Sequence, residues 1–262
     1  MLLKGKSALI TGASRGLGRA VAERFCEEGA TELALWARDM TRLNEVRSLL
    51  EKEGCRIWTA SVDLANVEMI DKAFNAFLAE SGGPPDILVN CAAQPALDDL
   101  VNIKVEDFDT TFAVNVKGAF FITKAVVKAL IDRKKEGSIV HLSSVSGKTG
   151  AAYGSVYSAS KAAVIAMVQA LSKELAPFNI RINTVCPGAM DTDMLHKGSI
   201  DVMAKRFNST HEAMLKGIIS TIPQKRILDP GEVADFIAFL ASDRAKAMTG
   251  QSINIASGME VH

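Results

Sequence analysis

The sequence predicts an α/β protein built on a doubly wound, parallel, seven-stranded sheet. Short apolar runs alternate with longer amphipathic segments along the 262 residues, and crossover-length segments rather than tight hairpin turns separate the runs. The first run also leads directly into a glycine-rich turn that opens a helical pattern, as in the Rossmann fold. Because 48% of the residues are apolar and no linker or repeat divides the chain, we expect a single domain over residues 1–262.

Seven runs are expected to be buried parallel strands, because they are continuously apolar in part. In chain order they are SALI (7–10), ELALW (32–36), RIWTASV (56–62), DILVN (86–90), SIVHLSS (138–144), RINTVC (181–186) and SINI (252–255). In a sheet of this kind, ligands bind beyond the carboxyl ends of the strands. The chemistry is therefore expected after the first, second, fourth, fifth and sixth strands.

Helical patterns fill the intervals between these strands. Two short patterns keep apolar residues on one face, Leu17, Val21 and Phe25 in the first and Phe74, Phe77 and Leu78 in the second. Longer patterns cover about 105–133 and 156–176, and Pro177 and Asn179 end the latter. Residues 189–229 break the rhythm. We expect them to form short helices that make a substrate lid after the sixth strand, the alternative being a surface insertion without a role.

Composition argues against several kinds of partner and site. Acidic and basic residues number 30 each, so the excess positive charge that nucleic acids and anionic membranes require is absent. The four cysteines lack CxxC spacing and indicate reduced, mostly buried thiols. The histidines are scattered without ligand spacing, so no metal site is expected. With no signal-peptide pattern and no apolar stretch of about 18 residues, we expect a soluble cytoplasmic protein.

The segment TGASRGLG after the first strand predicts a nucleotide site. Gly12, Gly16 and Gly18 let the backbone turn tightly and approach a pyrophosphate, which the amino end of the following helix stabilises through its free N–H groups. Ser14, Arg15 and Leu17 complete this loop. The alternative is a glycine turn that only connects strand and helix.

The end of the second strand favours NADP(H) over NAD(H). An acidic residue there would bind both ribose hydroxyls and repel a 2′-phosphate, whereas this chain has Ala37 followed by Arg38. Arg38 offers a fork of donors suited to phosphate, and Arg15 adds a second cation. Two alternatives stay open: both arginines are solvated surface charges, or the strand ends later and Asp39 accepts from the ribose.

Tyr157 and Lys161 lie one helical turn apart and predict an acid/base pair. A free tyrosine, with a pKa of about 10, is barely ionised at pH 7, and a nearby Lys161 ammonium together with an oxidised nicotinamide would lower that pKa. In the reduction direction the phenol donates its proton to the forming alkoxide. Ser144, at the end of the fifth strand, can hydrogen-bond the substrate oxygen.

With these motifs, the chain resembles the short-chain dehydrogenase/reductase family over essentially its whole length. The matching pieces are TGASRGLG, Asp63-Leu64, NCAA (90–93), Asn115 in NVKG, Ser144, YSASK (157–161), PGAMDT (187–192) and FLASDRAKAMTGQSINIASG. The resemblance implies that Asn115 holds a water that relays protons through Lys161, and that Lys161 and Tyr157 also contact the cofactor. It further implies that Asp63 and Leu64 contact adenine, that Asn90 lines the cofactor, and that Pro187, Gly188 and Thr192 hold the nicotinamide carboxamide. Asn115 as a plain mid-helix kink is the alternative.

Three positions depart from the family pattern. Ala93 stands where the family has glycine, which adds a methyl group beside the cofactor. Ala256-Ser257-Gly258 replaces the usual Asn or Asp with Gly-Gly, and His141 stands where the family often has Asn.

Within the family, the resemblance is to 3-oxoacyl-[acyl-carrier-protein] reductases. It implies an NADP(H)-dependent reductase of a 3-oxoacyl thioester, acting in fatty acid biosynthesis as a homotetramer in which helices 105–133 and 156–176 meet partner subunits. The substrate is then a small molecule or one borne by a carrier protein, which basic residues of the lid would attract: Lys197, Lys205, Arg206, Lys216, Lys225 and Arg226. The alternatives are a dehydrogenase or reductase of a polyol, sugar or other ketone, and a sensor or scaffold that binds NADP(H) without turnover.

Overall fold

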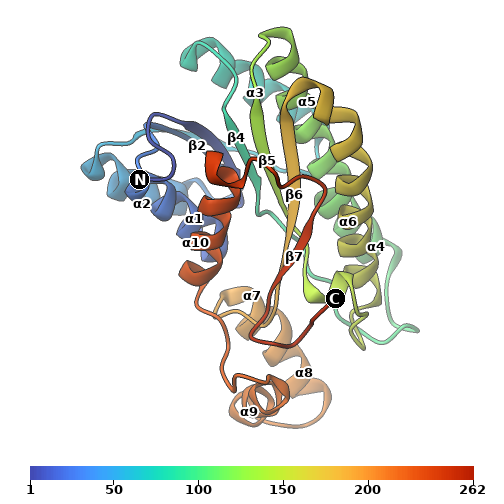
Figure 1. Cartoon of the computed structure of the whole chain (residues 1–262). Helices are drawn as coiled ribbons and strands as arrows, with labels where there is room; N and C mark the ends of the chain where they lie inside the picture. Colours follow the sequence, from blue (N-terminus) through green and yellow to red (C-terminus); the bar gives the residue numbers. More distant parts are fainter.

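The computed structural model describes all residues 1–262, and a parallel seven-stranded sheet forms its centre (Figure 1). The strands are β1 (Ser7–Thr11), β2 (Glu32–Ala37), β3 (Arg56–Ser61), β4 (Ile87–Asn90), β5 (Gly137–Leu142), β6 (Ile180–Pro187) and β7 (Ser252–Ile255). Their spatial order is β3-β2-β1-β4-β5-β6-β7, and every pair is parallel. The order reverses between β1 and β4, which is the point where ligands bind in doubly wound sheets. The predicted fold class is confirmed.

Helices cover both faces of this sheet. One face carries α1 (Gly16–Glu27), α2 (Met40–Leu50) and α10 (Pro230–Ala241), and the other carries α3 (Val67–Ser81), α5 (Ala119–Asp132) and α6 (Ser155–Leu175), with α4 (Val105–Phe112) packed on α6 (Figure 1). Leu17, Val21 and Phe25 all lie in the first apolar layer, as their spacing predicts. Two apolar cores, one on each face, therefore hold the sheet rigid beneath its carboxyl edge.

Two predicted elements differ by more than one residue at an end or are interrupted. β5 ends at Leu142, so Ser144 lies beyond the strand and caps a short turn (Val145–Gly147) by accepting a hydrogen bond from the Ser146 N–H. The predicted helix over 105–133 is divided by a π-helical turn, Ala113–Gly118. A Cβ at Gly118 would lie 2.8 Å from the Leu64 Cβ, so the chain passes closest to the segment after β3 at this turn.

Residues 189–229 form the short helices that the sequence predicts, and we keep the name lid for them. They are α7 (Asp193–Leu195), a π-helical turn (His196–Ile200), α8 (Asp201–Arg206) and α9 (His211–Thr221). They lie past the carboxyl ends of the strands, below the sheet in Figure 1. The two ends of the lid are joined, because the Leu228 N–H donates to the Ala189 carbonyl at 2.9 Å and the Asp191 N–H donates to the Leu228 carbonyl at 2.8 Å.

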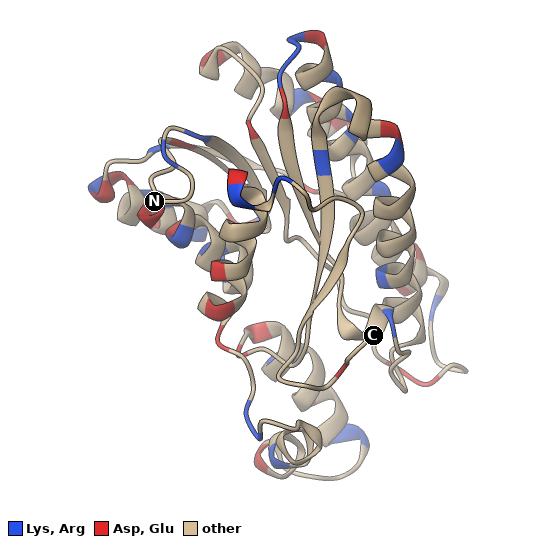
Figure 2. Cartoon of the chain, in the orientation of Figure 1, with Lys and Arg blue, Asp and Glu red and all other residues tan.

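The distribution of charged residues and the burial of the cysteines agree with what the composition predicts. Basic and acidic residues are interspersed along the helices and loops of the cartoon (Figure 2). Cys26, Cys55 and Cys186 are buried free thiols, and Cys91 is partly buried. No helix combines the length and hydropathy needed to span a membrane.

Candidate active site

The glycine loop lies against the turn that follows β4. Gly12 has φ +69°, and a Cβ there would lie 2.8 Å from the Ala92 amide nitrogen. A Cβ at Gly18 would lie 2.7 Å from the Gly12 carbonyl carbon. Both positions therefore require glycine, one for its backbone conformation and the other for close packing of the loop on α1. The loop residues Gly12, Ser14, Arg15, Gly16, Leu17 and Gly18 form one continuous strand-to-helix turn.

The residues of this loop fit a dinucleotide phosphate. Arg15 at the start of α1 makes no capping hydrogen bond with its side chain, as is also true of the residues that precede α4 and α6. The first N–H groups of a helix have no partner within it, so those of α1 are available to an anion. Thr192 lies over the same loop, with its Cγ2 3.5 Å from a Cβ built on Gly16.

Asp39 lies beyond the end of β2 and caps the next helix. The strand stops at Ala37, and the Asp39 carboxylate caps α2 by accepting from the Arg42 N–H at 3.1 Å. Asp39 is thus occupied as a helix cap, while the exposed Arg38 makes no ion pair. Arg15 is engaged by Asp193 of α7 at 3.2 Å, and Arg42 approaches the same carboxylate at 3.8 Å. The contact of Asp193 with both arginines was not predicted.

Ser144, Tyr157 and Lys161 come together beyond β5. The 145–147 turn packs closely on α6, since a Cβ at Gly147 would lie 2.8 Å from the Lys161 carbonyl carbon. The Ser144 side chain lies beside the Tyr157 hydroxyl, where it favours the phenolate. The Lys161 ammonium lies 5.6 Å from the centre of the Tyr157 ring and donates to the Leu142 carbonyl at 2.8 Å. The predicted trio therefore shares one site, with the lysine bonded to the backbone at the end of β5.

Burial shifts the pKa values of Tyr157 and Lys161. It raises the pKa of Tyr157 to about 12, and the smaller effect of the Ser144 hydrogen bond acts in the opposite direction. Burial also lowers the pKa of Lys161 to about 8. The expectation of a lowered tyrosine pKa is thus not met by the protein alone, because desolvation of the phenolate outweighs the hydrogen bond from Ser144. The phenol holds its proton at neutral pH.

Asn115 sits in the π-helical turn, and its side chain is fully hydrogen-bonded. Its carboxamide accepts from the Gln94 N–H at 2.7 Å and donates to the Gln94 carbonyl at 3.0 Å and to Ser160 Oγ at 2.9 Å. Turns of this kind occur often at functional sites. The amide thereby fixes the chain after β4 to α6, a positioning role that sequence spacing did not reveal.

Asn90 belongs to a buried hydrogen-bonded chain that includes His141. Thr11 Oγ1 donates to Asn90 Oδ1, and Asn90 Nδ2 lies 3.4 Å from His141 Nδ1. His141 Nε2 lies 3.0 Å from Thr123 Oγ1, which itself donates to the Ala119 carbonyl. Because the Thr123 hydroxyl donates its only proton to the Ala119 carbonyl, it can only accept from His141. His141 therefore carries its hydrogen on Nε2 and accepts a hydrogen bond from Asn90 at Nδ1. Burial lowers the pKa of His141 to about 3, which keeps the ring neutral.

The remaining predicted cofactor residues lie along the same edge with different degrees of access. Asp63 accepts from the Ala65 N–H, while Leu64 is 5% exposed and belongs to the core. Pro187 ends β6, and the Gly188 N–H donates to the Ile255 carbonyl at 3.0 Å.

Two histidines that look scattered in the sequence meet in the lid. His196 Nδ1 lies 3.1 Å from His211 Nε2, and the rings stack with centroids 5.2 Å apart. Each ring also contacts a carboxylate, His196 that of Asp191 at 2.8 Å and His211 that of Asp201 at 2.7 Å. This array links the start of the lid to α8 and α9. Nothing in the linear spacing of the histidines indicated it.

Comparisons with known proteins agree with this geometry. A family model described as enoyl-(acyl carrier protein) reductase matches residues 12–260. The 3-oxoacyl-[acyl-carrier-protein] reductase of Thermotoga maritima is 37% identical over 263 residues, covering 100% of each chain. A variant of actinorhodin polyketide ketoreductase with NADPH has a TM-score of 0.93 at 31% identity, covering 98% of each chain. The L-sorbose reductase of Gluconobacter frateurii with NADPH and L-sorbose has a TM-score of 0.90 at 32% identity, over 99% of this chain and 98% of the other.

These matches extend over nearly the whole chain, and the sheet order, the glycine loop and the grouping of Ser144 with Tyr157 and Lys161 are all consistent with them. The chain therefore belongs to the short-chain dehydrogenase/reductase family and is an oxidoreductase acting on carbonyl and alcohol groups.

Proposed function

We propose that this oxidoreductase uses NADPH to reduce the 3-oxo group of an acyl thioester to a secondary alcohol. The observation that carries the proposal is the grouping of Tyr157 and Lys161 on α6 with Ser144 beyond β5. Reduction of a carbonyl needs a proton donor beside the forming alkoxide, and the Tyr157 phenol supplies one. The same phenol is the base in the reverse reaction, so the direction is assigned from the similarity to a 3-oxoacyl-[acyl-carrier-protein] reductase.

The roles of the site residues follow from their contacts. NADPH, when bound by the glycine loop, supplies the hydride. Ser144 hydrogen-bonds the carbonyl oxygen, and Tyr157 gives its proton to that oxygen as negative charge develops. Lys161, with a pKa lowered to about 8, still carries charge at neutral pH and favours the phenolate that remains. We assign Asn115 to holding the chain after β4 in register with α6, beside the proton path through Lys161.

The cofactor preference and the contacts beyond the trio are part of the proposal. Arg38 is the free cation at the end of β2, and it is suited to a 2′-phosphate. Asp63 and Leu64 are assigned to adenine, and Asn90 to the cofactor wall. Pro187, Gly188 and Thr192 are assigned to the nicotinamide carboxamide. The relatives whose structures contain NADPH support this choice.

A cavity beside α8 offers apolar side chains to an acyl chain. It has a volume of about 430 Å³ and is lined by Leu97, Val202 and Met203 together with Asp98, Tyr153, Lys205 and Arg206. Its apolar side chains match a hydrocarbon chain, and the Asp98 carboxylate faces Arg206 at 3.6 Å. The 37% identity to a 3-oxoacyl-[acyl-carrier-protein] reductase makes the acyl thioester the first candidate. The similarity to L-sorbose reductase keeps sugar reduction as the second candidate.

The lid offers fewer free cations to a carrier protein than its sequence suggests. Of the six basic residues, Lys197 pairs with Asp193 at 3.0 Å, Arg206 pairs with Asp99, and Arg226 pairs with Glu232 at 2.6 Å. Lys205, Lys216 and Lys225 make no ion pair with a carboxylate. A carrier-borne substrate would therefore be attracted by these three lysines, and a thioester of a small carrier remains equally compatible.

We also propose that the protein acts in the cytoplasm, in fatty acid biosynthesis, as a homotetramer. Support for assembly comes from apolar side chains on α4 and α5 that face solvent, with Val105 71%, Phe108 45% and Phe120 42% exposed. Exposed apolar faces of this kind mark protein interfaces. Sedimentation of the purified protein tests the subunit count, and a monomer at micromolar concentration would contradict it.

The experiment that tests the function is a panel of 3-oxoacyl thioesters and sugars assayed by oxidation of NADPH. Reduction of the thioesters with kcat/KM at least about tenfold above the sugars is expected. In Tyr157→Phe, kcat should fall by at least about 10³-fold with the Kd for NADPH within about twofold. Substantial residual kcat in this variant would overturn the role of the phenol. Tight NADPH binding with no turnover on any substrate would favour the sensor alternative.

A further inference from the structure

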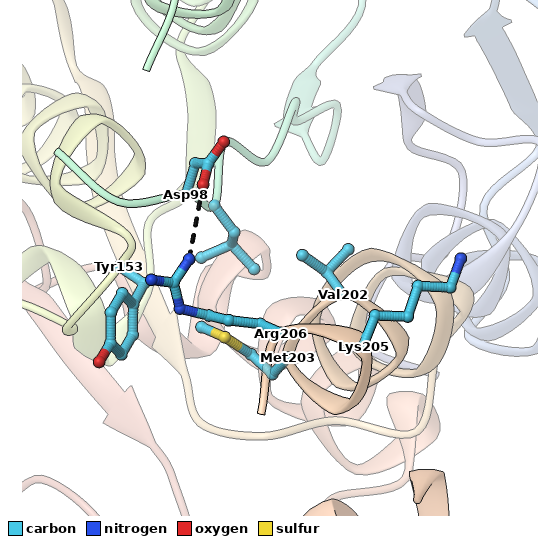
Figure 3. Close-up of a pocket in the computed structure, with 7 residues that line it drawn as sticks. Asp98, Tyr153, Val202, Met203, Lys205 and Arg206 are labelled. Atoms are coloured by element: carbon cyan, nitrogen blue, oxygen red, sulfur yellow. Dashed lines mark ion pairs between the residues drawn. The ribbon is translucent and has the colours of Figure 1, made fainter. Parts of the chain in front are cut away.

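A second cluster of interacting side chains lies outside the catalytic trio, where three segments meet around the cavity beside α8 (Figure 3). Leu97 and Asp98 follow β4, Tyr153 precedes α6, and Arg206 ends α8 of the lid. None of Ser144, Tyr157 and Lys161 lines this cavity. Tyr153 stands four residues before Tyr157, so a substrate that reaches this cavity from the catalytic trio would fill it with the part beyond the reacting carbonyl.

Arg206 joins these three segments. Its guanidinium stacks 4.5 Å from the centre of the Tyr153 ring, and it forms ion pairs with Asp98 at 3.6 Å and with Asp99. The Arg206 side chain is only 26% exposed. A guanidinium that stacks on a ring and is held by two carboxylates is stronger than an isolated surface ion pair. The end of α8 is thus fastened to the opposite wall of the cavity.

Tyr153 is held in an uncommon conformation at the same place. Its φ of +63° lies in the left-handed region, which bulky residues rarely adopt. The Asp98 N–H donates to the Tyr153 carbonyl at 2.9 Å, and Phe207 packs edge-on against its ring. Strained residues persist where surrounding contacts fix them. The Arg206 cluster provides such contacts four residues before Tyr157 in the sequence.

The charges in this cluster favour an uncharged ligand. Arg206 faces two carboxylates, so an anionic group would have to displace Asp98 or Asp99 to reach the guanidinium. Leu97, Val202 and Met203 supply the apolar part of the lining. An aliphatic chain gains from burial against such side chains.

We propose that Arg206 is a specificity-determining residue, which fastens the lid to Asp98, Asp99 and Tyr153 and so limits how far an uncharged acyl chain extends past the carbonyl. This inference rests on the proposed thioester reduction. Arg206 acts by fixing the end of the cavity, and the reacting atoms do not touch it. Its removal is expected to change chain-length preference more than the chemical step.

The test compares N-acetylcysteamine thioesters of a short and a long 3-oxo acid, acetoacetyl and 3-oxododecanoyl, by kcat/KM with saturating NADPH. Arg206→Ala should raise the long-to-short ratio about tenfold, through a lower KM for the long substrate, with kcat for the short one within about twofold. Arg206→Lys keeps the charge but loses the fork and most of the stacking, so an intermediate ratio is expected.

Two further variants separate the cluster from general effects on the lid. Arg226→Ala removes a guanidinium that is likewise held by a carboxylate, at the other end of the lid and outside the cavity lining, and should leave the ratio within about twofold. The double variant Asp98→Asn with Asp99→Asn should reproduce Arg206→Ala, and combining all three should add little. These variants also serve if Arg206→Ala fails to fold.

The outcomes are distinguishable. Turnover of the thioesters by the wild-type protein, with the same chain-length ratio in the Arg206 and Asp98/Asp99 variants, would overturn this inference and leave the proposed function intact. An equal change in Arg226→Ala would also overturn it. Failure of the wild-type protein to reduce either thioester would overturn both.

Discussion

Replacing Arg38 by alanine should convert a preference for NADPH into near indifference between NADPH and NADH. Arg38 follows the last residue of β2, is exposed and makes no ion pair, so its guanidinium is free to meet a 2′-phosphate. Arg15, the other candidate cation, already faces Asp193 at 3.2 Å. Arg38 is therefore expected to contribute more of the discrimination than Arg15.

The size of the effect follows from this exposure. A hydrogen bond between a charged donor and acceptor contributes about 1.5–3 kcal/mol, and the lower end applies to Arg38 because water and salt screen an exposed side chain. A loss of about 1.5 kcal/mol corresponds to about a tenfold rise in Kd for NADPH. NADH lacks the 2′-phosphate, so its Kd should change by less than about twofold.

The assay is fluorescence titration of both cofactors at low and high ionic strength. Arg47→Ala is the matched control, since it removes the same charge from α2 at a position paired with Glu51 at 2.7 Å, and it should alter neither Kd by more than about twofold. The effect of Arg38→Ala should shrink at high salt. Equal losses for NADPH and NADH would refute the assignment of Arg38 to the 2′-phosphate.

Three further predictions concern stability. Lys161→Met should abolish turnover yet raise the free energy of unfolding at pH 7 by about 2 kcal/mol in urea titrations. The reason is that the folded wild-type protein holds a buried ammonium, whose pKa is lowered to about 8 and which is charged below that pH. A less stable variant would contradict this. The pKa of His141 is lowered to about 3, so unfolded chains bind more protons than folded ones between pH 6.5 and 3. The free energy of unfolding of the wild-type protein should therefore fall as the pH is lowered from 6.5 to 5, more steeply than that of His141→Asn by up to about 1.4 kcal/mol per pH unit. Equal slopes for the two proteins would contradict this. Gly18→Ala should raise the Kd for NADPH at least about tenfold and lower the thermal midpoint, because the new Cβ would lie 2.7 Å from the Gly12 carbonyl carbon. Gly217→Ala is the control: the new Cβ meets only open space beside α9, so the change should be neutral or stabilise the fold by about 0.5–1 kcal/mol.

Local patterns carried most of the fold and the outline of the site. All seven strands fall where continuous apolar runs predict them, because buried parallel strands need such runs on both faces. The glycine loop needed no tertiary information either, since its residues are consecutive. Tyr157 and Lys161 were predictable as neighbours because helical geometry fixes positions i and i+4 on one face.

Contacts between distant segments left no such signal. Asp193 meets Arg15 across 178 positions, and Arg206 reaches Asp99 from the far side of the cavity. These pairs depend on how the lid folds back over the sheet, and charge alone does not specify a partner. Burial was equally hidden: the spacing of Tyr157 and Lys161 predicts their proximity, but the rise of the tyrosine pKa comes from desolvation by the surrounding fold.

That rise shows how much stabilisation the phenolate needs from outside the tyrosine itself. Half-ionisation of Tyr157 at pH 7 would require its pKa to fall by about five units from about 12, or about 7 kcal/mol. A unit positive charge 5.6 Å away, the distance from the Lys161 ammonium to the ring centre, interacts by about 3 kcal/mol at an effective dielectric constant of about 20. The lysine alone therefore leaves the phenol protonated, so the cofactor-free site holds a proton donor for carbonyl reduction. In the reverse direction the phenol has to lose this proton, and the positive charge of an oxidised nicotinamide would supply part of the remaining stabilisation of the phenolate.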